Sequence, residues 1–245
     1  MNMVKLMKIN IRGNDINYIQ YGKGQDVLLL HGWGQNIEMM KPIGDRLKNK
    51  RITILDLPGF GLSREPKEAL TIYDYCDIVE EFVKELKIKK PVVIGHSFGG
   101  RIAIIYASRN KVDRLVLFGS PCVRLQTKQP LKVRILKRIK RLPGMDKIGE
   151  WAKNFIGSRD YKTASPIMRE ILVNTVNEDL SSCAKKIKCP TLLIWGDHDT
   201  EATLEEAKLL EQLLDDGALI VLENATHYAY LEQINRVIQI LDHFI

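Results

Sequence analysis

The chain has 245 residues, of which 45% are hydrophobic and 27% charged, and its formal net charge is +7. This length suits one domain with a sizeable core, and the composition excludes a low-complexity or repeat protein. The N-terminus lacks the apolar stretch of a signal peptide, and no run approaches the ~18 apolar residues of a membrane span. The four cysteines form no Cys-x-x-Cys pair, which favours a reducing, cytoplasmic location.

The positive charge is concentrated in one segment. Residues 121–188 hold 16 Lys and Arg against 6 Asp and Glu, a net +10, whereas the rest of the chain carries −3. Eight basic residues and no acid lie between Arg124 and Arg141. A solvated surface explains this charge, and the alternatives are an anionic substrate or weak association with an acidic membrane surface. No nucleic-acid-binding motif accompanies the charge, so we expect no nucleic-acid partner.

Predicted strands and helices alternate along the chain. A hairpin is predicted over 8–20, because two β-type runs flank a Gly-Asn-Asp turn. The continuous apolar run at 26–30 is typical of a strand buried on both faces. The remaining expected elements are a helix at 37–47, a strand at 51–56, a helix at 72–86 capped by Thr71, a strand ending at Gly95 with a helix behind it, a strand at 112–118, a strand at 191–195, a helix at 203–214, a strand at 218–223 and a helix at 231–244. This order predicts an α/β fold with a mostly parallel sheet flanked by helices, whose ligand lies beyond the carboxyl ends of the strands.

The segment Gly95-His96-Ser97-Phe98-Gly99-Gly100 joins one of these strands to a helix. A chain that reverses so tightly leaves no room for side chains beside the serine, which explains Gly95 and Gly99. Ser97 is then held in a strained conformation with its hydroxyl exposed above the strand end. The N-terminus of the helix directs partial positive charge to the same place and favours a developing oxyanion. A serine that only caps the helix is the simpler alternative.

Three further stretches place chemically active residue types at predicted strand ends. They are His31-Gly32-Trp33-Gly34, residues 56–63, and Trp195-Gly196-Asp197-His198-Asp199 followed by His227. With the Ser97 turn, these stretches resemble, in the same order, the motifs of the α/β-hydrolase superfamily. The resemblance covers nearly the whole chain apart from a middle insertion. It implies the α/β-hydrolase fold and leaves the substrate open.

A serine hydroxyl becomes a nucleophile only when a base takes its proton, and histidine titrates near neutral pH. The family's order of nucleophile, acid and base implies that His227 is the base for Ser97. The family's Trp-Gly-x-x-Asp spacing places the acid at Asp199 and leaves Asp197 as a turn residue. The chain departs from the family at Thr226, where a glycine often precedes the histidine.

The oxyanion hole of this family consists of two backbone N–H groups. The resemblance assigns them to Trp33 and Phe98, whose rings would also wall an acyl pocket. A serine at position 97 argues against epoxide hydrolases and haloalkane dehalogenases, which carry an aspartate there.

The resemblance also predicts a domain organisation. Residues 1–120 and 189–245 would form the hydrolase core, and residues 121–188 a small, basic, helical cap over the site. Four apolar residues in this insertion recur at helical spacing between basic ones. They are Leu131, Ile135, Ile139 and Leu142.

Residues and resemblance together predict a cofactor-independent, carboxylesterase-like serine hydrolase. It would cleave an ester, thioester or related acyl bond of a small molecule through an acyl-enzyme on Ser97. The alternatives are a C–C bond hydrolase of activated ketones and a ligand-sensing receptor of the same fold with little turnover. A proline iminopeptidase is disfavoured, because the insertion is basic and no acidic pocket for a substrate amine is evident. No metal-ligand spacing and no phosphate-binding glycine loop occur, so neither metal nor cofactor is expected; the oligomeric state stays open.

Overall fold

The computed structural model describes residues 5–124 and 164–245. These ranges contain an eight-stranded sheet in the order β1-β2-β4-β3-β5-β6-β7-β8. β2 pairs antiparallel with β1 and with β4, and the other neighbouring strands are parallel. The strands are β1 (Leu6–Ile11), β2 (Asn14–Gly22), β3 (Gln25–Leu30), β4 (Lys50–Leu55), β5 (Val92–His96), β6 (Arg114–Phe118), β7 (Thr191–Gly196) and β8 (Gly217–Leu222). The predicted hairpin and mostly parallel α/β sheet are therefore confirmed.

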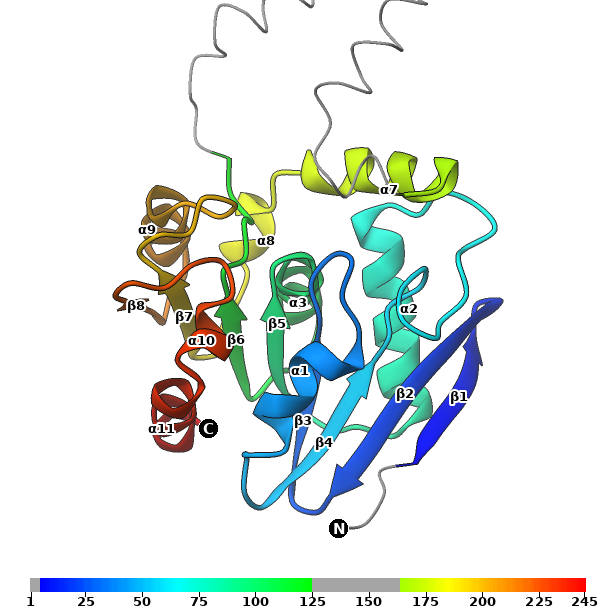
Figure 1. Cartoon of the computed structure of the whole chain (residues 1–245), viewed down its shortest axis with the longest axis horizontal. Helices are drawn as coiled ribbons and strands as arrows, with labels where there is room; N and C mark the ends of the chain where they lie inside the picture. The colour runs from blue at the N-terminus through cyan, green and yellow to red at the C-terminus, as the bar shows by residue number, and fades with distance from the viewer. Residues whose placement is uncertain (1–4, 125–163) are drawn as a thin grey trace, which may run out of the picture.

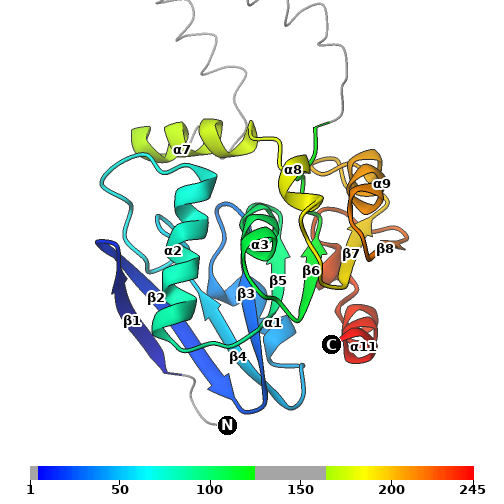
Figure 2. The ribbon, with the colours of Figure 1, turned by 180° about the vertical axis from the view of Figure 1, so that it is seen from behind.

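Helices cover both faces of the sheet (Figures 1 and 2). One face carries α1 (Ile37–Gly44), α10 (Ala229–Glu232) and α11 (Ile234–Phe244). The opposite face carries α2 (Ile72–Glu85), α3 (Phe98–Arg109), α8 (Ser181–Ala184) and α9 (Leu204–Leu213). A further helix, α7 (Pro166–Val176), lies across the end of the molecule toward which the parallel strands point (Figure 1). Both faces of the central strands are thus buried, as the apolar run in β3 predicts.

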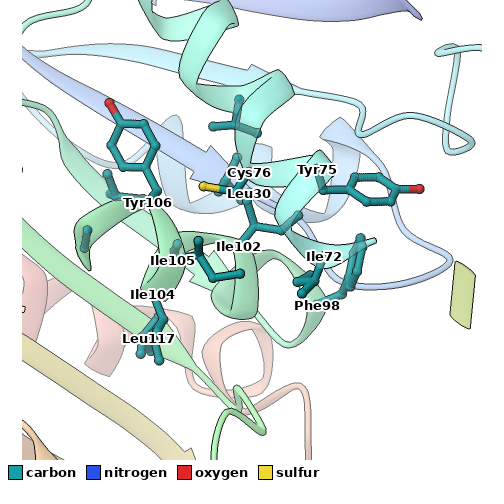
Figure 3. Close-up of a cluster of buried hydrophobic side chains, with 14 of the residues drawn as sticks. Leu30, Ile72, Tyr75, Cys76, Phe98, Ile102, Ile104, Ile105, Tyr106 and Leu117 are labelled. Atoms are coloured by element: carbon teal, nitrogen blue, oxygen red, sulfur yellow. The ribbon is translucent and has the colours of Figure 1, made fainter. Parts of the chain in front are cut away.

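The helix behind Ser97 is the most enclosed helix beside the sheet. All ten residues of α3 from Phe98 to Ala107 are buried. Figure 3 shows Ile102 and Ile105 of α3 among the side chains that it shares with α2, which include Tyr75 and Cys76. A helix that is apolar on most sides is stable only when packed on most sides. This packing fixes the start of α3 directly above β5.

Helix α2 begins where its sequence predicts. The Thr71 hydroxyl accepts a hydrogen bond from the Asp74 N–H at 3.2 Å, and the Asp74 carboxylate accepts one from the Thr71 N–H at 2.8 Å. This reciprocal capping box satisfies two N–H groups that the helix itself cannot pair. The prediction of Thr71 as the N-cap is confirmed.

Two predicted helices differ from the observed ones: the first ends earlier, and the last is interrupted. α1 stops at Gly44 rather than at residue 47, and the chain continues in a turn in which the Leu47 N–H bonds the Gly44 carbonyl at 3.3 Å. The single closing helix predicted over 231–244 is wrong, because α10 and α11 are separate. Gln233 interrupts them with φ −118° and ψ 42°, and its side-chain amide donates to the Glu223 carbonyl at 2.6 Å. That bond ties the interruption to the end of β8.

The strand–helix alternation is interrupted between β6 and β7, where the described residues contain α7 and α8. Met168 of α7 packs on Gly59, since a Cβ added to that glycine would lie 2.5 Å from the Met168 sulfur. α8 contacts α3 and α9. The predicted helical pattern of Leu131, Ile135, Ile139 and Leu142 lies outside the described residues, as do the basic side chains from 128 to 141. Within the described ranges, no helix has the length and apolar character needed to cross a bilayer.

Candidate active site

The stretches singled out in the sequence meet at one edge of the sheet. β3 to β8 run parallel, so their carboxyl ends lie at the same edge. The segments that leave these ends are 31–34 after β3, 56–63 after β4, Ser97 after β5, 197–199 after β7 and the His227 loop after β8. Residues far apart in the chain are thereby gathered at one place.

Ser97 occupies a strained turn between β5 and α3. Its φ of 49° and ψ of −111° lie outside the regions that non-glycine residues favour, at a cost of about 1–3 kcal/mol. A Cβ on Gly95 would lie 2.6 Å from the Gly100 Cα, and one on Gly99 would lie 2.3 Å from the Leu30 carbonyl oxygen. Both approaches are too close for any side chain, which confirms the predicted need for glycine at 95 and 99.

His227 is joined to Asp199. The imidazole Nδ1 lies 2.9 Å from Asp199 Oδ2, and both side chains are almost fully buried. The other carboxylate oxygen of Asp199 accepts hydrogen bonds from the N–H groups of Glu201 and Ala202, each at 2.9 Å. A carboxylate can only accept, so Nδ1 carries a proton, and in the neutral imidazole Nε2 is then the nitrogen with the lone pair. That tautomer is the one a general base requires.

Asp197 has a different partner. Its carboxylate accepts a hydrogen bond from the Ala225 N–H at 3.2 Å, and its own N–H bonds the Leu222 carbonyl at 3.1 Å. These bonds hold the loop after β7 against the loop that carries His227. The departure at Thr226 is accommodated there, because Glu232 accepts hydrogen bonds from both the Thr226 N–H and its hydroxyl.

The backbone N–H groups of Trp33 and Phe98 have no hydrogen-bond acceptor among residues 5–124 and 164–245. Phe98 is the first residue of α3, where the helix leaves its N–H groups unpaired. The rings of the two residues meet edge to face at 5.3 Å, and the ring of Phe60 lies 4.9 Å from that of Trp33. Phe60 comes from the 56–63 loop and was not foreseen as part of this aromatic cluster. No local pattern marks it, since it reaches Trp33 through the pairing of β3 with β4.

Two further histidines support these loops in neutral form. His31 accepts a hydrogen bond at Nε2 from the Leu57 N–H at 3.0 Å, so its Nδ1 carries the proton and donates to the Gly32 carbonyl at 2.7 Å. Burial lowers the pKa of His31. Burial, followed by the proximity of His227, lowers the pKa of His96 to about 3. Both rings therefore stay uncharged at neutral pH, and they act as hydrogen-bonding supports.

The structure brings Asp199 and His227 into contact but gives no hydrogen bond between Ser97 Oγ and His227 within the described ranges. Ser97 is half-buried, and its N–H bonds the Phe118 carbonyl at 3.0 Å. Instead, the carboxylate oxygen Oε2 of Glu201 lies 3.5 Å from His227 Nε2. Sequence reasoning missed Glu201. Its one sequence signal is its position two residues after Asp199, on the loop that leaves β7.

The described ranges contain no group of three or more His, Cys, Asp or Glu side chains arranged to hold a metal ion. His31 and His96 bond main-chain and amide groups instead. The chemistry available at this edge is therefore that of a serine, two carboxylates, histidines and backbone N–H groups.

Comparisons with known proteins agree with this fold. Residues 27–136 match the family model of the alpha/beta hydrolase fold. A proline iminopeptidase of Saccharolobus solfataricus is 27% identical over 96% of this chain and 90% of its own length. A pimeloyl-[acyl-carrier protein] methyl ester esterase of Aliivibrio fischeri is 24% identical over 91% of this chain and 95% of its own. The solved structure of a meta-cleavage product hydrolase from Pseudomonas fluorescens superposes with a TM-score of 0.75, at 24% identity, over 98% of this chain and 97% of that one.

The chain has the fold of the α/β-hydrolase superfamily, and the family model and the relatives show that its sequence is similar to that superfamily. The predicted fold is therefore confirmed, and the comparisons agree with the resemblance of the sequence motifs. The proteins named above act on different bonds, so the bond that this chain cleaves has to be argued from its own residues.

Proposed function

We propose that the chain is a cofactor-independent serine hydrolase that cleaves an ester, thioester or related acyl bond of a small molecule. The observation that carries the proposal is the 2.9 Å hydrogen bond from His227 to Asp199, at the sheet edge where Ser97 stands in a strained strand-to-helix turn. A buried carboxylate that orients a histidine, at the same sheet edge as a serine in a strained turn, is typical of a nucleophilic triad.

In this proposal the Ser97 hydroxyl attacks the acyl carbon while His227 Nε2 takes its proton. The carbonyl oxygen gains negative charge and is stabilised by the unpaired N–H groups of Trp33 and Phe98. The tetrahedral intermediate collapses as His227 returns the proton to the leaving group, which leaves an acyl-enzyme on Ser97. Water, deprotonated by His227, attacks this acyl group and regenerates the free serine. Asp199 holds the imidazole in the required tautomer throughout.

Covalent labelling tests the proposal directly. A fluorophosphonate probe should label the wild-type chain at Ser97, and Ser97→Ala should abolish labelling and lower turnover of short-, medium- and long-chain esters by about 10⁴-fold or more. Ser108→Ala, on the far end of α3, is the matched control. Labelling that persists in Ser97→Ala would falsify the assignment of the nucleophile.

A C–C bond hydrolase of activated ketones is the second candidate, favoured by the similarity to the meta-cleavage product hydrolase. Such an enzyme would use Ser97, Asp199 and His227 in the same positions. Assays with the ester panel and with an activated ketone that C–C bond hydrolases cleave distinguish the two functions. The activity that the chain has evolved for should exceed the other by orders of magnitude. A ligand sensor of this fold would label with the probe and turn over neither substrate at an appreciable rate.

The domain division is part of the same proposal: residues 1–120 and 189–245 form the core, and residues 121–188 form a small helical cap. It is supported by the interruption between β6 and β7 and by the place of α7 across the strand ends (Figure 1). The basic character of this insertion leaves two further options, an anionic acyl group and weak contact with an acidic membrane surface.

A further inference from the structure

Glu201 places an exposed carboxylate at the open side of His227. Its Oε2 lies 3.5 Å from Nε2, the nitrogen that Asp199 leaves free. The Glu201 side chain is 64% exposed, whereas the side chain of His227 is 6% exposed. The carboxylate therefore borders the space into which Nε2 opens.

The fold fixes the position of Glu201. Its N–H and that of Ala202 donate to the same Asp199 oxygen, at 2.9 Å each. The Ala202 carbonyl in turn accepts a hydrogen bond from the Trp195 indole at 2.8 Å. The residue that orients His227 thus also anchors the main chain of Glu201, so the Glu201 side chain starts from a fixed point next to the base.

In residues 5–124 and 164–245, no lysine or arginine lies within 4.0 Å of the Glu201 carboxylate, and its one ion-pair partner there is the imidazole of His227, which is charged only when protonated. Many other surface carboxylates in these ranges do have such a partner, as Asp77 has with Arg12 and Arg109. An unpaired carboxylate beside a reactive nitrogen is available to a ligand.

The acylation step places the leaving group at this carboxylate. His227 Nε2 must give its proton to the leaving atom, so that atom lies within about 3 Å of Nε2. A substituent two or three carbons beyond it reaches the carboxylate of Glu201. The carbonyl oxygen of the scissile bond would accept from the N–H groups of Trp33 and Phe98, and the acyl group lies on the other side of the scissile bond from the leaving group. Glu201 is thereby placed to distinguish leaving groups rather than acyl groups.

We propose that Glu201 is a specificity-determining residue that binds a cationic group, such as an ammonium, on the leaving group of the substrate. This inference rests on the proposed acyl hydrolysis. It gives the two sides of the substrate separate recognition: an aromatic wall for the acyl group, and a single carboxylate for a positively charged alcohol or amine. No bond to Glu201 forms or breaks in the reaction.

A pair of matched esters tests it. Choline butyrate and the butyrate of its neutral dimethylbutyl isostere carry the same acyl group and leaving groups of the same shape. The wild-type chain should have the larger kcat/KM for the cationic ester. Glu201→Gln should lower the ratio of the two kcat/KM values by about two- to fivefold, the range expected for one solvent-exposed charge pair. The change should appear mainly in KM, and Glu201→Lys should invert the preference.

The control is Glu205→Gln, an exposed glutamate in the first turn of α9, which should leave the ratio as it is in the wild type. The inference is overturned if esters are still hydrolysed in a Ser97-dependent way and the ratio is the same in wild type and Glu201→Gln. If both esters then lose rate equally, Glu201 acts on His227 rather than on the leaving group; if neither loses rate, Glu201 has no role in the reaction. If the wild type hydrolyses neither ester nor any other, the proposed function itself fails and the inference falls with it.

Discussion

Nε2 of His96 lies 3.1 Å from the carbonyl oxygen of His227, and the two imidazole rings are 4.8 Å apart. The residue before Ser97 therefore donates a hydrogen bond to the main chain of the histidine proposed as its base. This contact links the turn after β5 to the loop after β8. It explains why a buried polar ring occupies a position surrounded by apolar strands.

His96 should make the fold sensitive to acid. Its native pKa is about 3, whereas an unfolded histidine titrates near 6.5. Between these values the unfolded chain binds a proton that the native chain does not, so stability is lost as the pH falls from about 6.5 toward 3. His96→Asn should reduce the slope of the unfolding free energy in this window by up to about 1.4 kcal/mol per pH unit. Urea unfolding at several pH values measures it, and the exposed His243→Asn should keep the wild-type slope.

The two aspartates after β7 should differ in their effect on turnover. Asp199→Asn presents an amide where His227 donates, so the imidazole adopts the wrong tautomer and kcat for an ester should fall by about 10⁴-fold. Asp197→Asn keeps an amide oxygen that can accept from the Ala225 N–H and should cost less than about tenfold. Steady-state kinetics on one ester compares them. A larger loss for Asp197 would show that the Asp199 contact is structural.

Arg101 should be a major determinant of stability. Its buried guanidinium donates to the main-chain carbonyls of Pro121, Thr175 and Glu178, and burial lowers the pKa of this arginine. Arg101→Met leaves these buried carbonyls without a donor, and the free energy of unfolding should fall by about 3 kcal/mol or more. Arg64→Met, at a side chain that is 83% exposed, should change it by less than about 0.5 kcal/mol. Equal effects in urea unfolding would contradict this role.

The basic insertion gives a prediction about salt. If its charge attracts an anionic acyl substrate, kcat/KM for an anionic ester should fall steeply as the Debye length shrinks from about 10 Å at 0.1 M salt to about 3 Å at 1 M. A neutral ester should respond little. Replacing Lys137, Arg138, Lys140 and Arg141 with glutamine should remove the difference. Parallel salt profiles in the wild type would leave the segment as a solvated surface.

The fold was predictable because its signals are local. Most strands of the parallel part of the sheet are short apolar runs, the Thr71 cap is encoded within four residues, and the Ser97 turn needs glycines at fixed offsets. The interruption at Gln233 was not predictable, since it depends on a bond to Glu223 across a loop. Helical periodicity continues through that residue and gives no warning of it.

The candidate site was predictable only in part, for a related reason. Residue type, strand-end position and the resemblance to α/β-hydrolases select Ser97, Asp199 and His227 as proposals, and the structure joins Asp199 to His227. Glu201 and Phe60 reach the site through tertiary contacts that no spacing encodes. The role of Arg101 in joining segments was not predictable either, because the carbonyls that it binds lie twenty or more positions away in the sequence.

The three carbonyls held by Arg101 also have a consequence for how this chain can vary. Pro121 and Thr175 are brought to one guanidinium on α3, so the chain leaves the core and returns to it at neighbouring points. The entropy of closing a loop grows only logarithmically with its length, by about 0.6 kcal/mol for each doubling. Changes of chain length between Arg124 and the start of α7 should therefore cost little in loop-closure free energy. Evolution or a designer could vary the length of the chain there while α7 and the sheet edge beneath it keep their geometry.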